Sequence, residues 1–322
     1  MHARTLLFVL LAVWAIVPGW TGDARLDLLG KPVIRTERVA LDPADPARRR
    51  VGRLTFLGGV HLTSPDPAFG GFSALHVAGD RVTLLSDGGG LVRFRLLRDG
   101  RVSTPSFADL PAGPGTGWRK EDRDSEAMAV DAQGRAWVAF ERANAIWRFA
   151  PGFARAEAFV RPRAMACWAK NGGPESLVRR RDGGFVALRE TAAGDARFRE
   201  GLAWPGDPTR RLRPFGFRYR PPTGFDPSDA TELPDGRLLV LNRRWRYPLR
   251  LSSALVVIGR DAIRPGAVVR GIEIARLEAP LIHDNFEGVA ATVEGGRTVV
   301  WLVSDDNQWL LQRSLLLKFR LG

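Results

Sequence analysis

The chain has 322 residues, of which 45% are hydrophobic and 26% charged, and its formal net charge is +13 at pH 7. A single cysteine, Cys167, excludes an internal disulfide framework and a cluster of thiolate metal ligands. Glycine and proline are spread along the whole length, as many short strands and turns require, and no low-complexity tract divides the chain. These features favour one all-β domain, a fold class that often reaches this length without a boundary.

The positive charge comes almost entirely from arginine. Of the 48 basic residues only four are lysine. The arginines are dispersed, and no nucleic-acid-binding motif is present, so the skew is better explained by a GC-rich genome. We therefore predict no nucleic-acid partner, and the charge favours a small anionic or ester substrate or an anionic envelope surface.

Residues 1–24 have the layout of a secretory signal peptide. A short basic start, Met1 to Arg4, precedes an apolar run from Leu6 to Val17, which is too short to span a bilayer comfortably. No cleavage site matches well, so an uncleaved N-terminal anchor is the alternative. We predict an exported protein, periplasmic or secreted, with no transmembrane span beyond this leader.

From residue 51 onwards one unit occurs five times, at intervals of about 50 residues. Each unit has a polar cluster, an apolar run, a glycine turn, a second apolar run and a second polar cluster. In three copies a glutamate precedes the turn glycine by eight residues: Glu126 and Gly134, Glu175 and Gly183, and Glu287 and Gly295. Two weaker copies run from Ser73 to Asp87 and from Asp226 to Asn242.

Each unit is predicted to be a β-hairpin. The second run, such as Ala136–Phe140, is nearly continuous in apolar residues, which is typical of strands buried on both faces. Hairpins arranged around an axis form a β-propeller. Residues Arg53–Leu57 could pair with Leu315–Phe319 to complete a sixth blade and hide the open edges. We predict an all-β fold, a single six-bladed β-propeller over residues 51–322 closed by N- and C-terminal strands, preceded by an extended segment over 25–50.

The start of the first strand and the end of the second strand of a hairpin lie at the same edge. The polar residues at those places are therefore predicted to meet on one rim of the central channel: Glu126 with Glu141, Glu175 with Glu190, Asp226 and Asp229 with Asn242, and Asp284 and Glu287 with Asp305, Asp306 and Asn307. Carboxylates and amides are ligands of hard cations such as Ca²⁺. The alternative is that these side chains cap strand ends and fix turns.

Common catalytic signatures are absent from the sequence: there is no G-x-S-x-G elbow, no H-E-x-x-H and no P-loop. A Ser-His-Asp triad has no support. His283 adjoins the last acidic cluster and is a candidate general base, although a lone histidine can equally be a packed, hydrogen-bonded residue.

Several segments resemble one known family, the phytase-like or "esterase-like activity of phytase" family of exported bacterial proteins. They are Asp124–Met128, Asn171–Leu177, Leu233–Leu241 and Asp284–Val289, with Val303–Asn307 and Gln312–Leu317 near the end. The resemblance covers roughly residues 55 to 321. It implies a propeller-like fold and hydrolysis of carboxylic or phosphate esters, and it assigns no catalytic residue.

These observations together predict a monomeric propeller hydrolase with a divalent cation, Ca²⁺, at a carboxylate-rich rim. The predicted catalytic residues are Glu126, Glu287 and His283. The predicted metal ligands are Glu126, Glu175, Asp284, Glu287, Asp305 and Asp306. Arg243, Arg313 and Asn307 are predicted to bind substrate, because guanidinium groups suit phosphate and carboxylate. Two alternatives stay open: a non-catalytic ligand- or protein-binding propeller of the envelope, and a lactonase-type metal-dependent sugar hydrolase.

Overall fold

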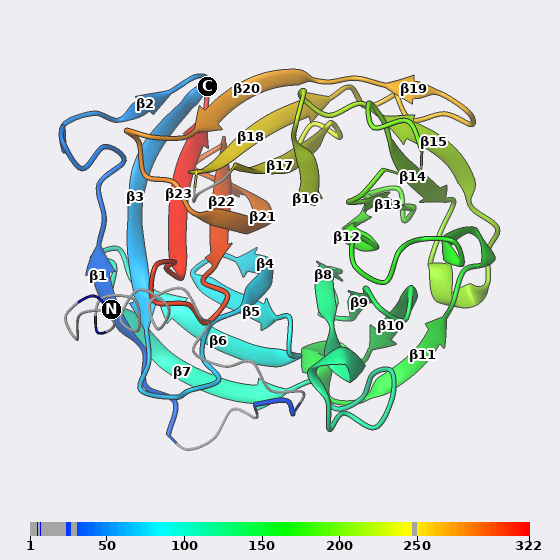
Figure 1. Ribbon diagram of the computed structural model, residues 1–322, viewed down its shortest axis with the longest axis horizontal. Helices are drawn as coiled ribbons and strands as arrows, with labels where there is room; N and C mark the ends of the chain where they lie inside the picture. The colour runs from blue at the N-terminus through cyan, green and yellow to red at the C-terminus, as the bar shows by residue number, and fades with distance from the viewer. Residues whose placement is uncertain (1–4, 6, 8–23, 27–30, 193, 247–249) are drawn as a thin grey trace.

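Five sheets, antiparallel except for one short outermost strand, surround one axis in the computed structural model of the protein, and the repeated hairpin supplies the two inner strands of each sheet (Figure 1). The innermost strands are β4 (Phe72–Ala78), β8 (Ser125–Val130), β12 (Pro174–Arg179), β16 (Asp226–Glu232) and β21 (Asn285–Glu294). The second strands are β5 (Arg81–Ser86), β9 (Ala136–Phe140), β13 (Phe185–Arg189), β17 (Leu238–Arg246) and β22 (Arg297–Asp305). Each innermost strand contacts the innermost strands of both neighbouring sheets, so the five close into a ring.

The outer strands complete the blades of this β-propeller. The third strands are β6 (Gly90–Leu96), β10 (Ala145–Phe149), β14 (Arg199–Trp204), β18 (Arg250–Ile258) and β23 (Leu315–Leu321). The fourth strands are β7 (Val102–Asp109), β11 (Ala156–Val160), β15 (Phe215–Tyr219), β20 (Ile272–Leu277) and β3 (Leu54–Thr63). Three short strands extend two blades: β1 (Arg35–Arg38) and β2 (Arg50–Val51) pair with β3, and β19 (Val268–Val269) pairs with β15. The loops contain the 3-10 turns η1 (Lys120–Arg123), η2 (Pro151–Phe153), η3 (Arg163–Met165) and η4 (Pro208–Arg210).

The prediction of six blades is wrong, because the propeller has five. The predicted pairing of the terminal strands does occur: β3 and β23 are antiparallel, with Phe56 opposite Phe319 and Leu54 opposite Leu321. They do not form a separate blade. Instead they lie beside β22 and provide the outer half of the last blade, whose inner half is the β21–β22 hairpin (Figure 1). Two strands alone would leave that hairpin with an unpaired edge, and the terminal strands cover it.

Five hydrophobic clusters fill the five interfaces between neighbouring blades. Strand β17 shows how one strand serves two interfaces. Leu239 and Leu241 pack on the side of the last blade, whereas Leu238 and Val240 pack on the side of the preceding blade. Because successive side chains of a strand point to opposite faces, a strand between two blades must be apolar at every position. This explains the continuous apolar runs of the sequence.

The structure describes residues 5, 7, 24–26, 31–192, 194–246 and 250–322. Most of the predicted leader, residues 1–24, therefore lies outside the described residues. Within the described part of the chain, no helix has the length and apolar character needed to cross a membrane.

Candidate functional site: an acidic central channel

Every innermost strand has a β-bulge at the same place near its start. The register between the two inner strands shifts there in all five blades, and the bulged residues are Ser73, Glu126, Glu175, Ser228 and Glu287. A bulge redirects the side chain that it carries, and bulges are frequent next to active sites. Three blades therefore place a glutamate at the same point of the fold.

In the other two blades the bulged residue is a serine that ties neighbouring blades together. The Ser73 hydroxyl donates to the carbonyl oxygen of Ser125 at 2.6 Å, and the Ser228 hydroxyl donates to the carbonyl oxygen of Phe286 at 3.1 Å. The equivalent position is structural in these two blades and acidic in the remaining three.

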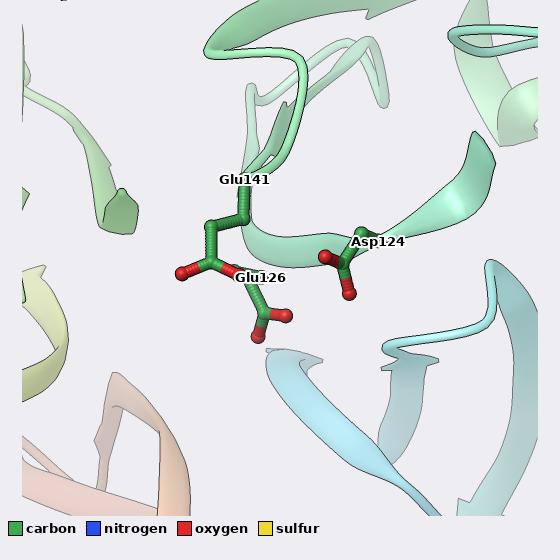
Figure 2. A group of neighbouring side chains, drawn as sticks. All are labelled: Asp124, Glu126 and Glu141. Carbon is green, nitrogen blue, oxygen red and sulfur yellow. The ribbon is translucent and has the colours of Figure 1, made fainter. Parts of the chain in front are cut away.

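Additional carboxylates reach the same end of the channel from the ends of the second strands. Glu141 follows β9 and Glu190 follows β13, while Asp124 immediately precedes β8. Figure 2 shows the carboxylates of Asp124, Glu126 and Glu141 close together. One oxygen from each of these three lies within 4.8 Å of the others, and the same holds for Glu141, Glu175 and Glu190. Glu141 belongs to both groups, so two candidate cation positions share one ligand.

Glu126 and Glu175 carry the least compensated carboxylates of these two groups. Neither side chain has a hydrogen-bond or ion-pair partner anywhere in the described part of the chain, although Glu175 is buried and Glu126 is half-buried. A buried charge without a hydrogen-bond or ion-pair partner is unfavourable, so these groups favour a proton or a bound cation, although the charge of Arg243 offsets part of this cost for Glu175.

Glu141, in contrast, is held by the backbone of the loop before β12. Its Oε1 atom accepts hydrogen bonds from the amides of Gly172 and Gly173, the latter at 3.0 Å. Gly172 has a φ of +100°, and a Cβ atom there would lie 2.2 Å from Cγ2 of Thr191. Only glycine permits both the conformation and the close approach.

We expect Gly172→Ala to weaken cation binding at this site by about tenfold, because the added Cβ displaces the amides that orient Glu141, and loss of such support typically costs 10–100-fold. Isothermal titration with Ca²⁺ measures the effect. Gly194→Ala is the matched control, since Gly194 also has a φ of +100° but has nothing within 4 Å of its Cβ position. Equal Ca²⁺ affinities of Gly172→Ala and Gly194→Ala would show that the loop before β12 does not support cation binding through Glu141.

Arg243, near the end of β17, lies between two of the carboxylates. Its guanidinium group donates to Glu190 Oε1 from Nη2 at 2.6 Å and also forms an ion pair with Glu287. Asn285 supports the same arrangement, because its Nδ2 donates to Glu287 Oε1 at 2.8 Å and its Oδ1 accepts from Arg243 at 3.1 Å. Arg243, on the fourth blade, thus links this blade to both of its neighbours, the third and the fifth.

The electrostatics follow from crowding like charges in a buried channel. Burial, together with Glu141 and Asp87, raises the pKa of Asp124 to about 7. Burial and the neighbouring carboxylates also raise the pKa values of Glu126, Glu175 and Asp305 well above the usual range. Since Glu126 responds to both Glu287 and Asp87, these side chains form one interacting acidic cluster.

Lys120 of η1 supplies positive charge on the opposite side of the channel. It forms an ion pair with Asp87, the residue that follows β5. Burial opposes its charge, but Asp87, Asp305 and Asp124 outweigh that effect and raise the pKa of Lys120. Lys120 and Arg243 therefore offset part of the negative charge of the cluster.

The last acidic segment is largely engaged in fixing its own loop. Asp306 accepts hydrogen bonds from the amides of Gly71 and Gln308 and from the Ser314 hydroxyl, at 3.0, 3.0 and 2.7 Å. Asp305 accepts from the Asn307 amide at 2.6 Å. This geometry corresponds to the turn-fixing alternative considered for these residues.

Two further predicted site residues, Asp284 and Arg313, pair with each other. Arg313 Nε lies 3.4 Å from Asp284 Oδ2. Burial nevertheless raises the pKa of Asp284 to about 6. His283 has its Nδ1 atom 2.7 Å from the carbonyl oxygen of Leu281. A carbonyl only accepts, so Nδ1 carries the proton and, in the neutral ring, Nε2 carries the lone pair.

The fourth blade does not add carboxylates to the cluster. Asp229 accepts from the amides of Ala230 and Val289, both at 2.7 Å, and so joins β16 to β21. Asp226 forms an ion pair with Arg199, and Asn242 accepts from the Tyr219 hydroxyl at 3.1 Å.

A pocket with a volume of about 630 Å³ adjoins the cluster at Glu190. Its walls include Arg243 and Asn307, two of the three predicted substrate-binding residues, together with Trp245 and Trp309. The pocket therefore connects the acidic channel to the exposed indole of Trp245 and the half-buried Trp309.

The sequence placed Glu141 and Glu190 on the rim, but none of Asp87, Lys120, Asp124, Glu141 and Glu190 was among the predicted catalytic, metal-binding or substrate-binding residues. The hairpin repeat did predict that Glu141 lies beside Glu126 and Glu190 beside Glu175, and both juxtapositions are observed. Asp87 occupies the corresponding place in the first blade. Lys120 lies in a loop outside the repeat, and no pattern in the sequence points to it.

The raised pKa values predict an unusual pH dependence of stability. A carboxyl group whose pKa is higher in the folded than in the unfolded protein stabilises the fold when protonated, and this stability is lost as pH rises through the folded pKa, about 7 for Asp124. We expect cation-free protein to melt at a lower temperature at about pH 8 than at about pH 5.5. Added Ca²⁺ should raise the melting temperature more at the higher pH.

Differential scanning fluorimetry in chelator and in Ca²⁺ checks this expectation. Burial lowers the pKa of His76, so this residue reduces stability as the pH falls below its ordinary pKa, which is opposite to the effect of the carboxyl groups. For this reason the wild type is compared with the Glu126→Gln variant. The variant should show a smaller loss between the two pH values. If the melting temperature of the variant falls as much as that of the wild type, the pH dependence arises from groups outside the channel.

Fold and site define a class: a five-bladed β-propeller with a carboxylate-lined central channel. Residues 67–308 match the model of the family described as "Phytase-like: Esterase-like activity of phytase". The chain therefore belongs to the phytase-like family, as its sequence motifs predicted. No curated protein matches the sequence significantly.

Solved structures resemble the chain only distantly. Virginiamycin B lyase from Staphylococcus aureus is 11% identical over 90% of this chain and 100% of that one, with a TM-score of 0.42. A protein provisionally assigned as a gluconolactonase is 12% identical over 90% and 100%, with a TM-score of 0.42. The Swd1 β-propeller domain of Myceliophteria thermophila is 10% identical over 89% and 98%, also at 0.42. Such distant similarity carries no information about the activity of this chain.

Proposed function

We propose that the protein is an exported hydrolase of carboxylic or phosphate esters, with a divalent cation bound by the channel carboxylates. The observation that carries the proposal is the pair Glu126 and Glu175, whose carboxylates lie in the channel without a partner among the described residues. Scaffold carboxylates accept hydrogen bonds, as Asp229 and Asp306 do here. Uncompensated ones concentrated in one channel are better suited to a cation or to proton transfer.

The ligand set favours Ca²⁺, a hard cation that takes carboxylate oxygens in flexible geometry. Oxygens within 4.8 Å of one another can contact one ion at the usual Ca²⁺–oxygen distances of about 2.3–2.6 Å. Because the structure brings together two groups of three carboxylates, the proposed cation ligands are Asp124, Glu126, Glu141, Glu175 and Glu190. A cation bound there would polarise the substrate oxygen or lower the pKa of water.

The remaining roles, accepting a proton and binding substrate, are proposed for side chains of the protein. Glu287, held by Arg243 and Asn285, is oriented to accept a proton from water, and Glu126 is the second candidate for that role. His283 stays a predicted base through Nε2. Arg243, Arg313 and Asn307 are proposed to contact substrate. Asn307 lies on the wall of the adjoining pocket, so that pocket is the proposed substrate entrance.

A metal analysis coupled to a substrate panel tests this function. Purified protein is assayed on carboxylic esters, lactones and phosphate monoesters, with and without chelator, and its metal content is measured. Turnover that chelator removes and Ca²⁺ restores supports the proposal. Protein that binds no divalent cation and turns over none of the three classes would refute it. Cation binding without turnover would favour the binding-propeller alternative.

Export forms a separate part of the proposal, supported by the basic start and apolar run of residues 1–17. Cell fractionation with N-terminal sequencing of the product tests it. Recovery in the cytoplasm with residue 1 intact would refute export. We expect the purified protein to be a monomer by light scattering.

A further inference from the structure

The pocket beside Glu190 contains two tryptophans. Trp245, near the end of β17, is 61% exposed, and Trp309 lies in the loop after β22. An exposed indole on a pocket wall leaves a large apolar face in water. Ligand pockets typically combine such faces with a few polar groups that fix orientation. The chemistry of those polar groups indicates which ligand fits.

The charged groups of the pocket are already paired within the protein. Arg243 contacts both Glu190 and Glu287, so one guanidinium faces two carboxylates. Asp226 accepts from Arg199 Nε at 2.7 Å. A phosphate or carboxylate entering the pocket would have to compete with Glu190 and Glu287 for Arg243. The pocket is therefore poorly suited to an anionic ligand.

The polar atoms left over are neutral. Asn307 Nδ2 donates to Gln312 Oε1 at 2.8 Å, which orients both amides. In the described part of the chain, this leaves Asn307 Oδ1 as an acceptor and Gln312 Nε2 as a donor, with no partner for either. Hydroxyl groups both donate and accept, so a polyhydroxylated ligand matches this pair.

We propose that this pocket binds a neutral saccharide, with the apolar face of a sugar ring against Trp245 and hydroxyl groups on Asn307 and Gln312. The inference rests on the proposed function for its consequence and selects carboxylic over phosphate esters within it: the substrate would be an uncharged sugar ester whose acyl group lies at the channel. Hydrolysis would join the water oxygen to the acyl carbon and break its bond to the sugar oxygen. That oxygen takes a proton, and the products are a carboxylic acid and the free sugar.

Direct binding separates this inference from catalysis. Titration calorimetry is performed in chelator, where no metal-dependent turnover occurs, with neutral methyl glycosides and oligosaccharides, the corresponding sugar phosphates, and an uncharged alanine peptide. The expected result is binding of at least one neutral saccharide, with the matching sugar phosphate weaker by at least about tenfold. Trp245→Ala should weaken saccharide binding by about tenfold or more, as truncation of a central tryptophan usually does.

Trp245→Phe keeps an aromatic face and should retain most of the binding. Trp118→Ala is the matched control, because Trp118 is 81% exposed but does not line the pocket. Stronger binding of the sugar phosphate, equal binding of the peptide, absence of saccharide binding, or equal losses in Trp245→Ala and Trp118→Ala would each overturn the inference. Saccharide binding without ester turnover would leave it standing and refute the proposed hydrolase instead.

Discussion

Replacing Glu126 with Gln is expected to lower kcat/KM for the proposed ester hydrolysis by at least about 100-fold while making the cation-free protein more stable. The activity loss is the size typical of removing an acid–base group, and here a proposed cation ligand is removed as well. The gain in stability arises because burial and neighbouring carboxylates raise the pKa of Glu126 well above its usual range. Removing that ionisable group should raise the free energy of unfolding at about pH 8 by on the order of 1 kcal/mol.

A fall in kcat/KM together with a rise in the free energy of unfolding distinguishes a functional carboxylate from a scaffold one. Glu175→Gln is expected to behave in the same way. Glu121→Gln is the control, since Glu121 is an exposed glutamate three residues before Asp124. Steady-state kinetics and chemical denaturation in chelator provide the two readouts. A Glu126→Gln protein that is destabilised and fully active would show that Glu126 belongs to the scaffold.

Replacing Arg243 with Ala should cause a large loss of stability, because it leaves Glu190 and Glu287 in the channel without their shared cation. Breaking a fully buried ion pair by removing one partner costs about 3–5 kcal/mol, and because the Arg243 side chain is 28% exposed we expect the low end of that range. The loss should be largest at about pH 8 and smaller at about pH 5, because burial raises the pKa of Glu287 and its protonation at the lower pH removes one of the two negative charges. Chemical denaturation at both pH values measures it, in chelator so that a bound cation does not substitute for the guanidinium.

Two variants serve as references for Arg243→Ala. Arg313→Ala removes an arginine whose side chain is 43% exposed and whose Nε lies 3.4 Å from Asp284, so it should cost less than about 1 kcal/mol. Arg243→Lys keeps the charge but loses the fork that reaches two carboxylates, and its cost should be intermediate. Equal losses of stability for Arg243→Ala and Arg313→Ala would show that the ion pairs of Arg243 with Glu190 and Glu287 contribute little to stability.

The local elements of this fold could be read from the sequence because they depend on short-range geometry. A turn glycine such as Gly134, between apolar runs, predicts a hairpin, since its φ of 82° is unfavourable for other residues. The pairing of Glu126 with Glu141 follows directly from that hairpin. The number of blades does not follow from it, because β3 and β23 carry no glycine-turn repeat and could complete either a new blade or an existing one.

The candidate site could be predicted only in part. The sequence located the acidic rim and the glutamates of three blades, but it named six acidic residues together as metal ligands. The structure separates them: among the described residues Glu126 and Glu175 have no hydrogen-bond or ion-pair partner, Glu287 pairs with Arg243, and Asp306 accepts hydrogen bonds from its own loop and the Gly71 amide. These assignments depend on contacts between residues tens to hundreds of positions apart, which no local pattern encodes.

The sequence by itself determined the hairpin, its period and the polar residues at each hairpin edge, because strand alternation and turn conformation involve only neighbouring residues. The tertiary structure decided that the blades number five, that Glu141 serves two carboxylate groups, and that Arg243 is occupied by Glu190 and Glu287. The physical reason is closure of the ring. Only when five blades meet around one axis do their buried carboxylates come close enough to repel one another, and this crowding gives the channel its proposed affinity for a cation.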